Sequence, residues 1–241
     1  MALQLAPEEP EAGPWRVAAL SAVMTALMRN GPREPGAGRP VIVAMDGRSA
    51  SGKTTLAARM HGAVRASAAV HTDDIAWAHS RFGWADLLVD GILEPMRRGA
   101  AVSFRPPGWA SVGREGAIEI PAGCPLLLVE GVGAGRREVA GLIDALVWVQ
   151  SDAEQARQRD LGRVGTPGGP VSVQAIQEWA DEEIPFVAAD RAWERADLIV
   201  CGTPQLPHDP STALVVARRL TALRARSGGR TRPRPGFRRS P

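Results

Sequence analysis

The stretch VIVAMDGRSASGKT, residues 41–54, decides the fold of this chain. Its apolar run, residues 41–45, is typical of a buried strand, and the residues from Gly47 to Thr54 have the spacing G-x-x-x-x-G-K-[ST] of a phosphate-binding loop. The glycines of such a loop let successive backbone N–H groups point at phosphate oxygens, and the helix that follows adds its positive N-terminus. The pattern therefore predicts a strand–loop–helix unit that binds the phosphates of a nucleotide.

Lysine occurs once in the sequence, at Lys53 inside this loop, although lysine and arginine together number 29. A lysine ammonium is compact and flexible, whereas a guanidinium is a planar fork, so the single lysine indicates a site that only the compact group fits. The motif predicts that Lys53 reaches the β- and γ-phosphates of ATP and that the hydroxyl of Thr54 binds Mg²⁺. The residues of this segment expected to contact ATP are Gly47, Arg48, Ser49, Ala50, Ser51, Gly52, Lys53, Thr54 and Thr55.

Short apolar runs and helical patterns alternate along the rest of the chain. Further strands are expected at 68–72, 125–131, 145–150 and 197–202. Helices are expected at 15–29, 53–66, 84–98, 136–143, 152–160, 172–189 and 211–225, and a β-hairpin at 102–107 and 116–120. Strands without polar alternation are typical of a parallel sheet that is covered on both faces. The expected fold class is α/β, a P-loop NTPase-type three-layer α/β/α arrangement with a parallel sheet of about five strands and a β-hairpin insertion.

The composition limits the kind of protein that this chain can be. A length of 241 residues with 44% hydrophobic residues is that of a globular protein with a substantial core. No apolar run approaches the roughly 18 residues that a membrane span requires, and the first dozen residues lack the basic region of a secretory signal. Two cysteines, Cys124 and Cys201, cannot form a disulfide framework, so a reducing, cytoplasmic location is expected.

The net charge of +3 is unevenly distributed. Seven arginines and no acidic residue lie within residues 224–241, so the rest of the chain is net negative and lacks the basic character of a nucleic-acid-binding protein. We expect a flexible N-terminus over 1–14, one kinase-type domain over 15–223 and a disordered arginine-rich tail over 224–241. Binding of nucleic acid or of an acidic partner by this tail is the less favoured alternative, and the sequence indicates no oligomeric state.

Acidic residues follow two of the expected strands, and ligands of open α/β sheets bind at the carboxyl ends of the strands. Asp73 is the first choice for the base that accepts a proton from a hydroxyl attacking the γ-phosphoryl group, and Asp74 is the alternative. Both could instead cap the helix that follows. Glu130 ends the most apolar strand and can bind Mg²⁺ directly or through water, or it can be an ordinary hydrogen-bonded acid at a strand end.

In their order along the chain, these motifs resemble the uridine kinase family, which belongs to a group of P-loop kinases that includes phosphoribulokinase and pantothenate kinase. The stretches that carry the resemblance are VIVAMDGRSASGKTTLA, HTDD, LLLVEGVGA and the arginine-bearing segment 157–163, within residues 38–204. The resemblance implies ATP and Mg²⁺ as cofactors, Asp73 as general base and Glu130 as the acid after the third strand. It also implies a lid helix whose arginines contact the phosphates, with Arg157, Arg159 and Arg163 as candidates, and a loop beside adenine formed by Gly202, Thr203 and Pro204.

The segments on the acceptor side depart from the family pattern. Members that phosphorylate uridine have an F-D-H-P-D stretch whose first acid binds the ribose hydroxyls, but this chain reads FGWAD over 82–86, and Asp86 is the candidate replacement. The hairpin reads FRPPGW over 104–109, without the Tyr and His that contact uracil in the family. Packing of the insertion is the alternative role of the tryptophans, and pairing with a carboxylate is that of Arg105. The residues expected to contact the acceptor are Asp74, Trp77, Phe82, Trp84, Asp86, Arg105 and Trp109.

The function that these observations favour is that of an ATP-dependent kinase, which transfers the γ-phosphoryl group to a hydroxyl of a small molecule. A nucleoside is the leading acceptor, although the departures argue against uridine itself. The first alternative is a kinase for another acceptor, such as a cofactor precursor, a sugar or an antibiotic. The second is a non-enzymatic, nucleotide-dependent switch.

Overall fold

The structure of the chain is a computed structural model, and it describes residues 3–5, 7–31, 38–167 and 169–217. The arginine-rich segment 224–241, for which the sequence predicts a disordered tail, lies outside these residues. These described residues form two sheets, a central seven-stranded sheet and a two-stranded hairpin. No helix within the described ranges has the length and apolar character that crossing a membrane requires.

Five parallel strands form the centre of the main sheet, which confirms the prediction from the apolar runs. Their order in the sheet is β8-β7-β2-β6-β3. The strands are β2 (Val41–Asp46), β3 (Ala68–His71), β6 (Leu126–Glu130), β7 (Ala145–Gln150) and β8 (Leu198–Cys201). Their register places Glu130 between Met45 and His71. The carboxyl ends of β2, β6 and β3 therefore meet at one edge of the sheet.

Two antiparallel strands extend this sheet on the β8 side, and both correct a prediction. The expected helix over 15–29 is a strand, β1 (Arg16–Ala19), followed by a shorter helix, α1 (Leu20–Met28). The expected helix over 211–225 is in its described part a strand, β9 (Ala213–Val216). β9 pairs with β1 and with β8, and it buries Leu214, Val215 and Val216. Long-range backbone pairing outweighs the local helical spacing here, and β-branched valines pack well in strands.

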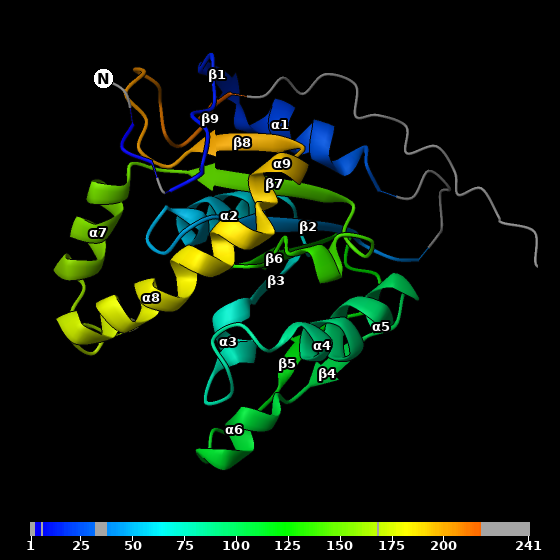
Figure 1. Cartoon of the computed structure of the whole chain (residues 1–241). Coiled ribbons are helices and arrows are strands. Elements are labelled where there is room, and N and C mark those ends of the chain that lie inside the picture. The colour runs from blue at the N-terminus through cyan, green and yellow to red at the C-terminus, as the bar shows by residue number, and fades with distance from the viewer. Residues whose placement is uncertain (1–2, 6, 32–37, 168, 218–241) are drawn as a thin grey trace, which may run out of the picture.

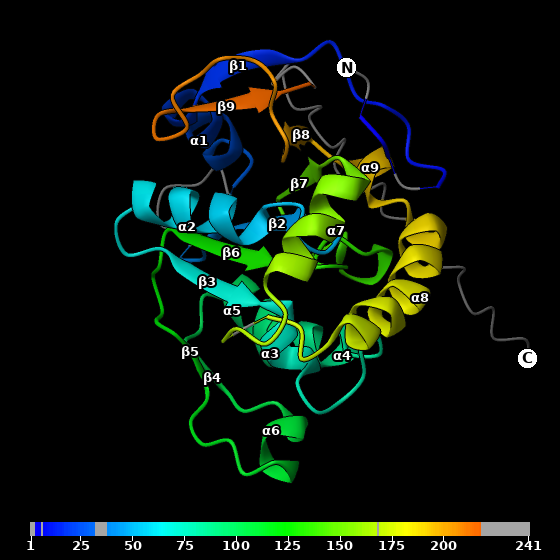
Figure 2. The same cartoon turned by 90° about the vertical axis from the view of Figure 1, so that its left-hand side faces the viewer.

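Helices cover both faces of the sheet, so the expected three layers are present (Figures 1 and 2). The principal helices are α2 (Lys53–Ala63), α3 (Thr72–Ala76), α7 (Ala153–Gly162), α8 (Val173–Asp190) and α9 (Ala192–Arg195). The expected helix over 136–143 is only one 3₁₀ turn, η2 (Arg137–Val139), in a segment bordered by Gly135 and Gly141. Glycine weakens helices because it loses more conformational freedom on folding than other residues do.

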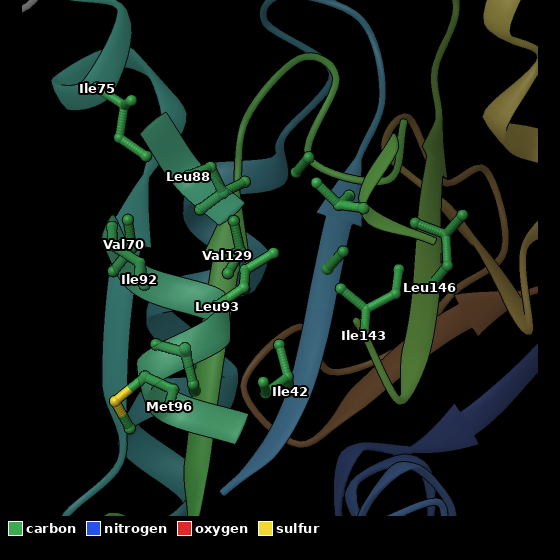
Figure 3. Close-up of a cluster of buried hydrophobic side chains, with 14 of the residues drawn as sticks. Ile42, Val70, Ile75, Leu88, Ile92, Leu93, Met96, Val129, Ile143 and Leu146 are labelled. Atoms are coloured by element: carbon green, nitrogen blue, oxygen red, sulfur yellow. The ribbon is translucent and has the colours of Figure 1, made fainter. Parts of the chain in front are cut away.

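The expected helix over 84–98 is present as three contiguous segments. They are α4 (Ala85–Leu88), a π-helical turn η1 (Val89–Leu93) and α5 (Glu94–Arg97). Pro95 lies at the start of α5, which directly follows the π-helical turn. Figure 3 shows this helical segment against β3 and β6, with Leu88, Ile92 and Met96 beside Val70 and Val129.

Side chains alternate between two apolar clusters, one on each face of the sheet. In β2, Ile42 packs in the cluster under α4 and α5, whereas Val43 packs in the cluster under α1 and α2. A shift of one residue in the pairing of a strand would move its side chains to the opposite faces, so the apolar pattern specifies the register of the sheet. The rigid sheet holds the carboxyl ends of its strands in place for the candidate site.

The predicted hairpin is present, and it projects away from the main sheet (Figure 1). Its strands are β4 (Val102–Phe104) and β5 (Ile118–Ile120), and a short helix, α6 (Pro107–Ser111), lies in the connection.

The N-terminal segment makes defined contacts with the sheet. Glu9 is buried and accepts hydrogen bonds from Trp148 Nε1 at 2.7 Å and Gln150 Nε2 at 2.9 Å, contacts that the composition did not suggest.

Candidate active site

The phosphate-binding loop connects β2 to α2 and curls around its own lysine. Gly52, the residue before α2, has a left-handed backbone with φ +102°, which favours glycine over other residues. Lys53 is buried, and its Nζ donates to the carbonyl oxygen of Arg48 at 2.7 Å. The only lysine of the chain is thus held inside the loop that the motif assigns to phosphates.

The loop after β8 lies directly against this phosphate-binding loop. A Cβ on Gly202 would come within 1.9 Å of the carbonyl oxygen of Ser51, so the approach requires glycine at this position. The hydroxyl of the buried Thr203 accepts a hydrogen bond from the backbone N–H of Asp152. Gly202 and Thr203, which the resemblance assigns to the nucleotide, therefore lie where the loop meets the end of β8.

Glu130, Thr54 and His71 form a polar group at the ends of β6 and β3. The Thr54 hydroxyl lies 3.2 Å from Glu130 Oε1, and His71 Nδ1 lies 2.5 Å from the same oxygen. A hydroxyl and a carboxylate are a donor set that Mg²⁺ accepts, and Mg²⁺ at phosphates commonly takes few protein ligands. Within the described residues no group of three or more His, Cys, Asp or Glu side chains could hold a metal ion. Thr54 and Glu130 therefore fit a Mg²⁺ ion that takes its remaining ligands from phosphate oxygens and water.

The proton affinities of this group depend on one another. Burial alone would raise the pKa of Glu130, but the hydrogen bond from His71 and the charge of Lys53 outweigh burial and lower it. The same hydrogen bond raises the pKa of His71, against a smaller opposing effect of burial. Glu130 is therefore an anion near neutral pH, as a ligand of Mg²⁺ must be.

Asp73 and Asp74 lie in the first turn of α3 but differ in what their carboxylates contact. Asp74 Oδ1 accepts a hydrogen bond from Arg114 Nη2 at 2.8 Å. Asp73 has no hydrogen-bond partner among the residues that the structure describes, and its residue is exposed. Crowding by protein atoms nevertheless raises its pKa, with the Glu130 charge adding to this and the charge of Lys53 opposing it. Asp73 is thus a carboxylate that no described side chain engages, close enough to Lys53 to feel its charge.

The hairpin connection contributes a stacked group next to Asp74. Trp109 is buried, and its Nε1 donates to the carbonyl oxygen of Asp74 at 2.7 Å. The Arg114 guanidinium lies 3.7 Å from the centre of the Trp109 ring and 5.5 Å from that of Trp77. Trp77 is 54% exposed, and it is the tryptophan of this group that offers an open ring face. Arg105 donates to the carbonyl oxygen of Arg114, and within the described ranges it pairs with no carboxylate.

The side chains of the FGWAD stretch, residues 82–86, do not lie together at one surface. Trp84 is 1% exposed and packs in the core, which leaves no face for an acceptor and corrects its expected role. Phe82 stacks on Phe186 of α8 with ring centres 4.3 Å apart. Asp86 is exposed in the first turn of α4.

The arginines expected in a lid lie on and next to α7. Arg159 donates to the carbonyl oxygen of Ala50 at 3.0 Å and to that of Gly202 at 3.1 Å. Arg163 pairs with Asp160, and Arg157 is exposed on the same helix. Arg159 is therefore the one of the three that touches the phosphate-binding loop in this arrangement.

Several residues of the site could not be chosen from the sequence. Asp46 ends β2 and accepts three backbone hydrogen bonds, from Gly47, Gly133 and Gly135, at 2.7 to 2.9 Å. Burial raises the pKa of Asp46 to about 6, although these amides lower it. Its position before the first glycine of the motif was the one available signal. Arg114 and Glu183 reach the site only through tertiary contacts, whereas His71 belongs to the HTDD stretch and only its bond to Glu130 was unforeseen.

Comparisons with known proteins bear on the fold. No protein-family model matches the chain, and no curated protein matches it. A possible uridine kinase from Bacillus stearothermophilus is 18% identical, with a TM-score of 0.41 over 75% of this chain and 98% of that one. The protein TT1252 from Thermus thermophilus is 17% identical, with a TM-score of 0.39 over 69% and 91%. A proposed fructose transport system kinase from Silicibacter sp. TM1040 is 20% identical, with a TM-score of 0.51 over 74% of this chain and 95% of that one.

The third of these similarities is close enough to define the architecture. It covers nearly the whole of the neighbour's chain and about three quarters of this one. The strand order, the phosphate-binding loop between β2 and α2 and the hairpin are all present in the described residues. The chain therefore shares the fold of this neighbour, a three-layer α/β arrangement with a phosphate-binding loop after β2.

Proposed function

We propose that the chain transfers the γ-phosphoryl group of ATP to a hydroxyl group of a small molecule. The observation that carries this proposal is the convergence of Lys53, Thr54, Glu130 and Asp73 at the adjoining ends of β2, β6 and β3. A kinase needs a cationic cradle, a metal ligand and a base at one point, and these residues supply all three.

Each residue has a role that follows from its surroundings. The amides of the phosphate-binding loop and Lys53 hold the phosphates and stabilise their charge during transfer. Thr54 and Glu130 would hold Mg²⁺, which neutralises charge on the phosphate oxygens. Asp73 accepts the proton of the attacking hydroxyl, because no described residue occupies its lone pairs and its raised pKa makes it a better base than an ordinary aspartate. Arg159 contributes a further positive charge at the loop.

The acceptor side favours a molecule with a flat or apolar ring. Trp77 offers an exposed ring face, and Arg114 adds a cation that is partly neutralised by Asp74. A nucleoside fits these groups, whereas the absence of an acid at Gly83 disfavours uridine as the best acceptor. A cofactor precursor, a sugar or an antibiotic is the competing class.

The test is a screen of hydroxyl compounds with ATP and Mg²⁺, in which the release of ADP is measured. We expect one nucleoside or ring-bearing alcohol to stimulate ADP formation strongly and to gain a phosphoryl group, seen by mass spectrometry. Slow ATP hydrolysis that no acceptor stimulates would instead support the nucleotide-dependent switch. Failure of the chain to bind ATP would contradict both.

A further inference from the structure

A carboxylate from α8 reaches the phosphate-binding loop from the side opposite its lysine. Oε1 of Glu183 accepts a hydrogen bond from the backbone N–H of Ser49 at 2.5 Å. Glu183 is 2% exposed, and it lies in the middle of α8, far from either end of that helix. A buried carboxylate is costly unless it is hydrogen-bonded, so this contact is the feature that explains its position.

The peptide unit that Glu183 contacts is the one that holds Lys53. The N–H of Ser49 and the carbonyl of Arg48 belong to the same peptide group. In a trans peptide these two bonds point in opposite directions. Glu183 accepts the N–H on one side, and Lys53 Nζ donates to the carbonyl oxygen on the other at 2.7 Å. The direction of the Arg48 carbonyl, and with it the position of the Lys53 ammonium, is therefore tied to Glu183.

The charges around Glu183 fit this connection. Burial raises the pKa of Glu183, while the Ser49 N–H and the positive charges of Lys53 and Arg48 lower it and Asp160 of α7 raises it. Glu183 forms no ion pair with any residue that the structure describes. Its specific partner is the backbone amide, and hydrogen bonds that run in series polarise and strengthen one another.

We propose that Glu183 is a positioning residue, which orients the Arg48–Ser49 peptide and thereby places the Lys53 ammonium for the phosphates. This inference rests on the proposed binding of ATP at the loop. It connects α8 to the phosphate cradle, one residue away from the point where Arg159 of α7 contacts Ala50. Figure 2 shows α7 and α8 on the side of the sheet ends where this loop lies.

Two variants of similar volume separate the hydrogen bond from the charge. Glu183→Gln keeps a carbonyl oxygen for the Ser49 amide, and Glu183→Met fills the space without a strong acceptor. Both remove the negative charge, so a difference between them reports the hydrogen bond. Glu183→Ala is a second variant without an acceptor if methionine does not pack, and a thermal melt shows which variants fold.

The single lysine makes a direct measurement available. Protein labelled with ¹³C-lysine should give one side-chain Cε signal, from Lys53, and Lys53→Arg should remove it. We expect this signal to keep its position in Glu183→Gln and to move in Glu183→Met. Glu182→Met is the matched control, because Glu182 is exposed on the same helix and pairs with Arg81. It should leave the signal unchanged.

Calorimetry of ATP binding gives the second readout. We expect ATP to bind up to about tenfold more weakly to Glu183→Met than to Glu183→Gln, the loss that one strong neutral hydrogen bond produces. Equal lysine signals and equal ATP affinities in these two folded variants would overturn the inference. If the unaltered chain does not bind ATP, the proposed function fails, whereas the lysine signal still tests the connection from Glu183 to Lys53.

Discussion

Two adjacent carboxylates, Asp73 and Asp74, differ in what they are free to do. Asp74 accepts from Arg114 and its carbonyl oxygen from Trp109, while the Asp73 carboxylate accepts no hydrogen bond from the described residues and has a raised pKa. The sequence left the choice between them open. The contacts favour Asp73 as the base. Asp74 instead binds Arg114 and Trp109 and so attaches the hairpin connection to α3.

Asp73→Asn should separate ATP binding from chemistry. Asparagine has nearly the same shape but is a far weaker base, and loss of a general base costs about 10²–10⁴ in rate. We expect kcat with a verified acceptor to fall by that factor while the ATP affinity, measured by calorimetry, changes little. Asp74→Asn should cost much less in kcat. A dead Asp74→Asn variant beside an active Asp73→Asn variant would move the base by one residue.

The His71–Glu130 pair predicts a dependence of stability on pH. The folded chain raises the pKa of His71 above its usual 6.5 through the hydrogen bond to Glu130. The protonated pair therefore stabilises the fold below about pH 6.5, and this contribution is lost as the pH rises through the folded pKa. Because the His71 side chain is 43% exposed, we expect at most about 1 kcal/mol.

Urea unfolding without Mg²⁺ tests this pair. The unfolding free energy of the unaltered chain should exceed that of His71→Ala by more at about pH 6 than at about pH 9. Glu130 stays ionised over this range, because its pKa is lowered. A difference that is independent of pH would show that His71 contributes by packing alone.

At the scale of elements, the close approach of the β8 loop to the phosphate-binding loop has a sharp consequence. Gly202→Ala would place a methyl group 1.9 Å from the carbonyl oxygen of Ser51, so one of the two loops must move. Overpacking of this kind costs about 1–3 kcal/mol. We expect a lower melting temperature and weaker ATP binding. Gly62→Ala is the control, since α2 has free space there and alanine is more favourable than glycine in a helix by about 1 kcal/mol. It should not lower the melting temperature.

Elements that depend on a local sequence pattern could be predicted, whereas elements that depend on long-range pairing could not. The five parallel strands are buried apolar runs, and the phosphate-binding loop is a local pattern, so both were found at their places. β1 and β9 were expected to be helices, because their strand state depends on pairing between segments almost 200 residues apart. A local spacing rule does not contain that pairing.

The same division holds inside the site. Lys53, Thr54 and Glu130 belong to motifs and meet as their spacing predicts. Glu183 and Arg114 carry no local signal, since Glu183 contacts a residue 134 positions away in the chain and Arg114 one 40 positions away. Trp84 was expected at the acceptor and is in the core, because composition does not reveal which face of a helical segment is buried.

At the scale of the whole molecule, the last described strand defines how much of the chain the fold needs. β9 contributes three buried side chains, Leu214, Val215 and Val216. Burying an aliphatic side chain of this size stabilises a protein by about 1.5–3 kcal/mol, so loss of β9 would remove a large part of a typical stability of about 5–15 kcal/mol. Residues 224–241 are rich in Arg, Pro and Gly and offer almost nothing to bury.

Truncation at two points therefore has opposite expected outcomes. A chain cut after Leu223 should keep its melting temperature and its kcat with a verified acceptor, because the removed segment carries charge but little apolar surface. A chain cut after Thr212 lacks β9, exposes one side of β8 and leaves β1 without its partner, so it should unfold or aggregate. Melting curves and initial rates on both chains measure this. A large loss of kcat in the longer chain, with its melting temperature unchanged, would mean that the arginine-rich segment takes part in binding the phosphates or the acceptor.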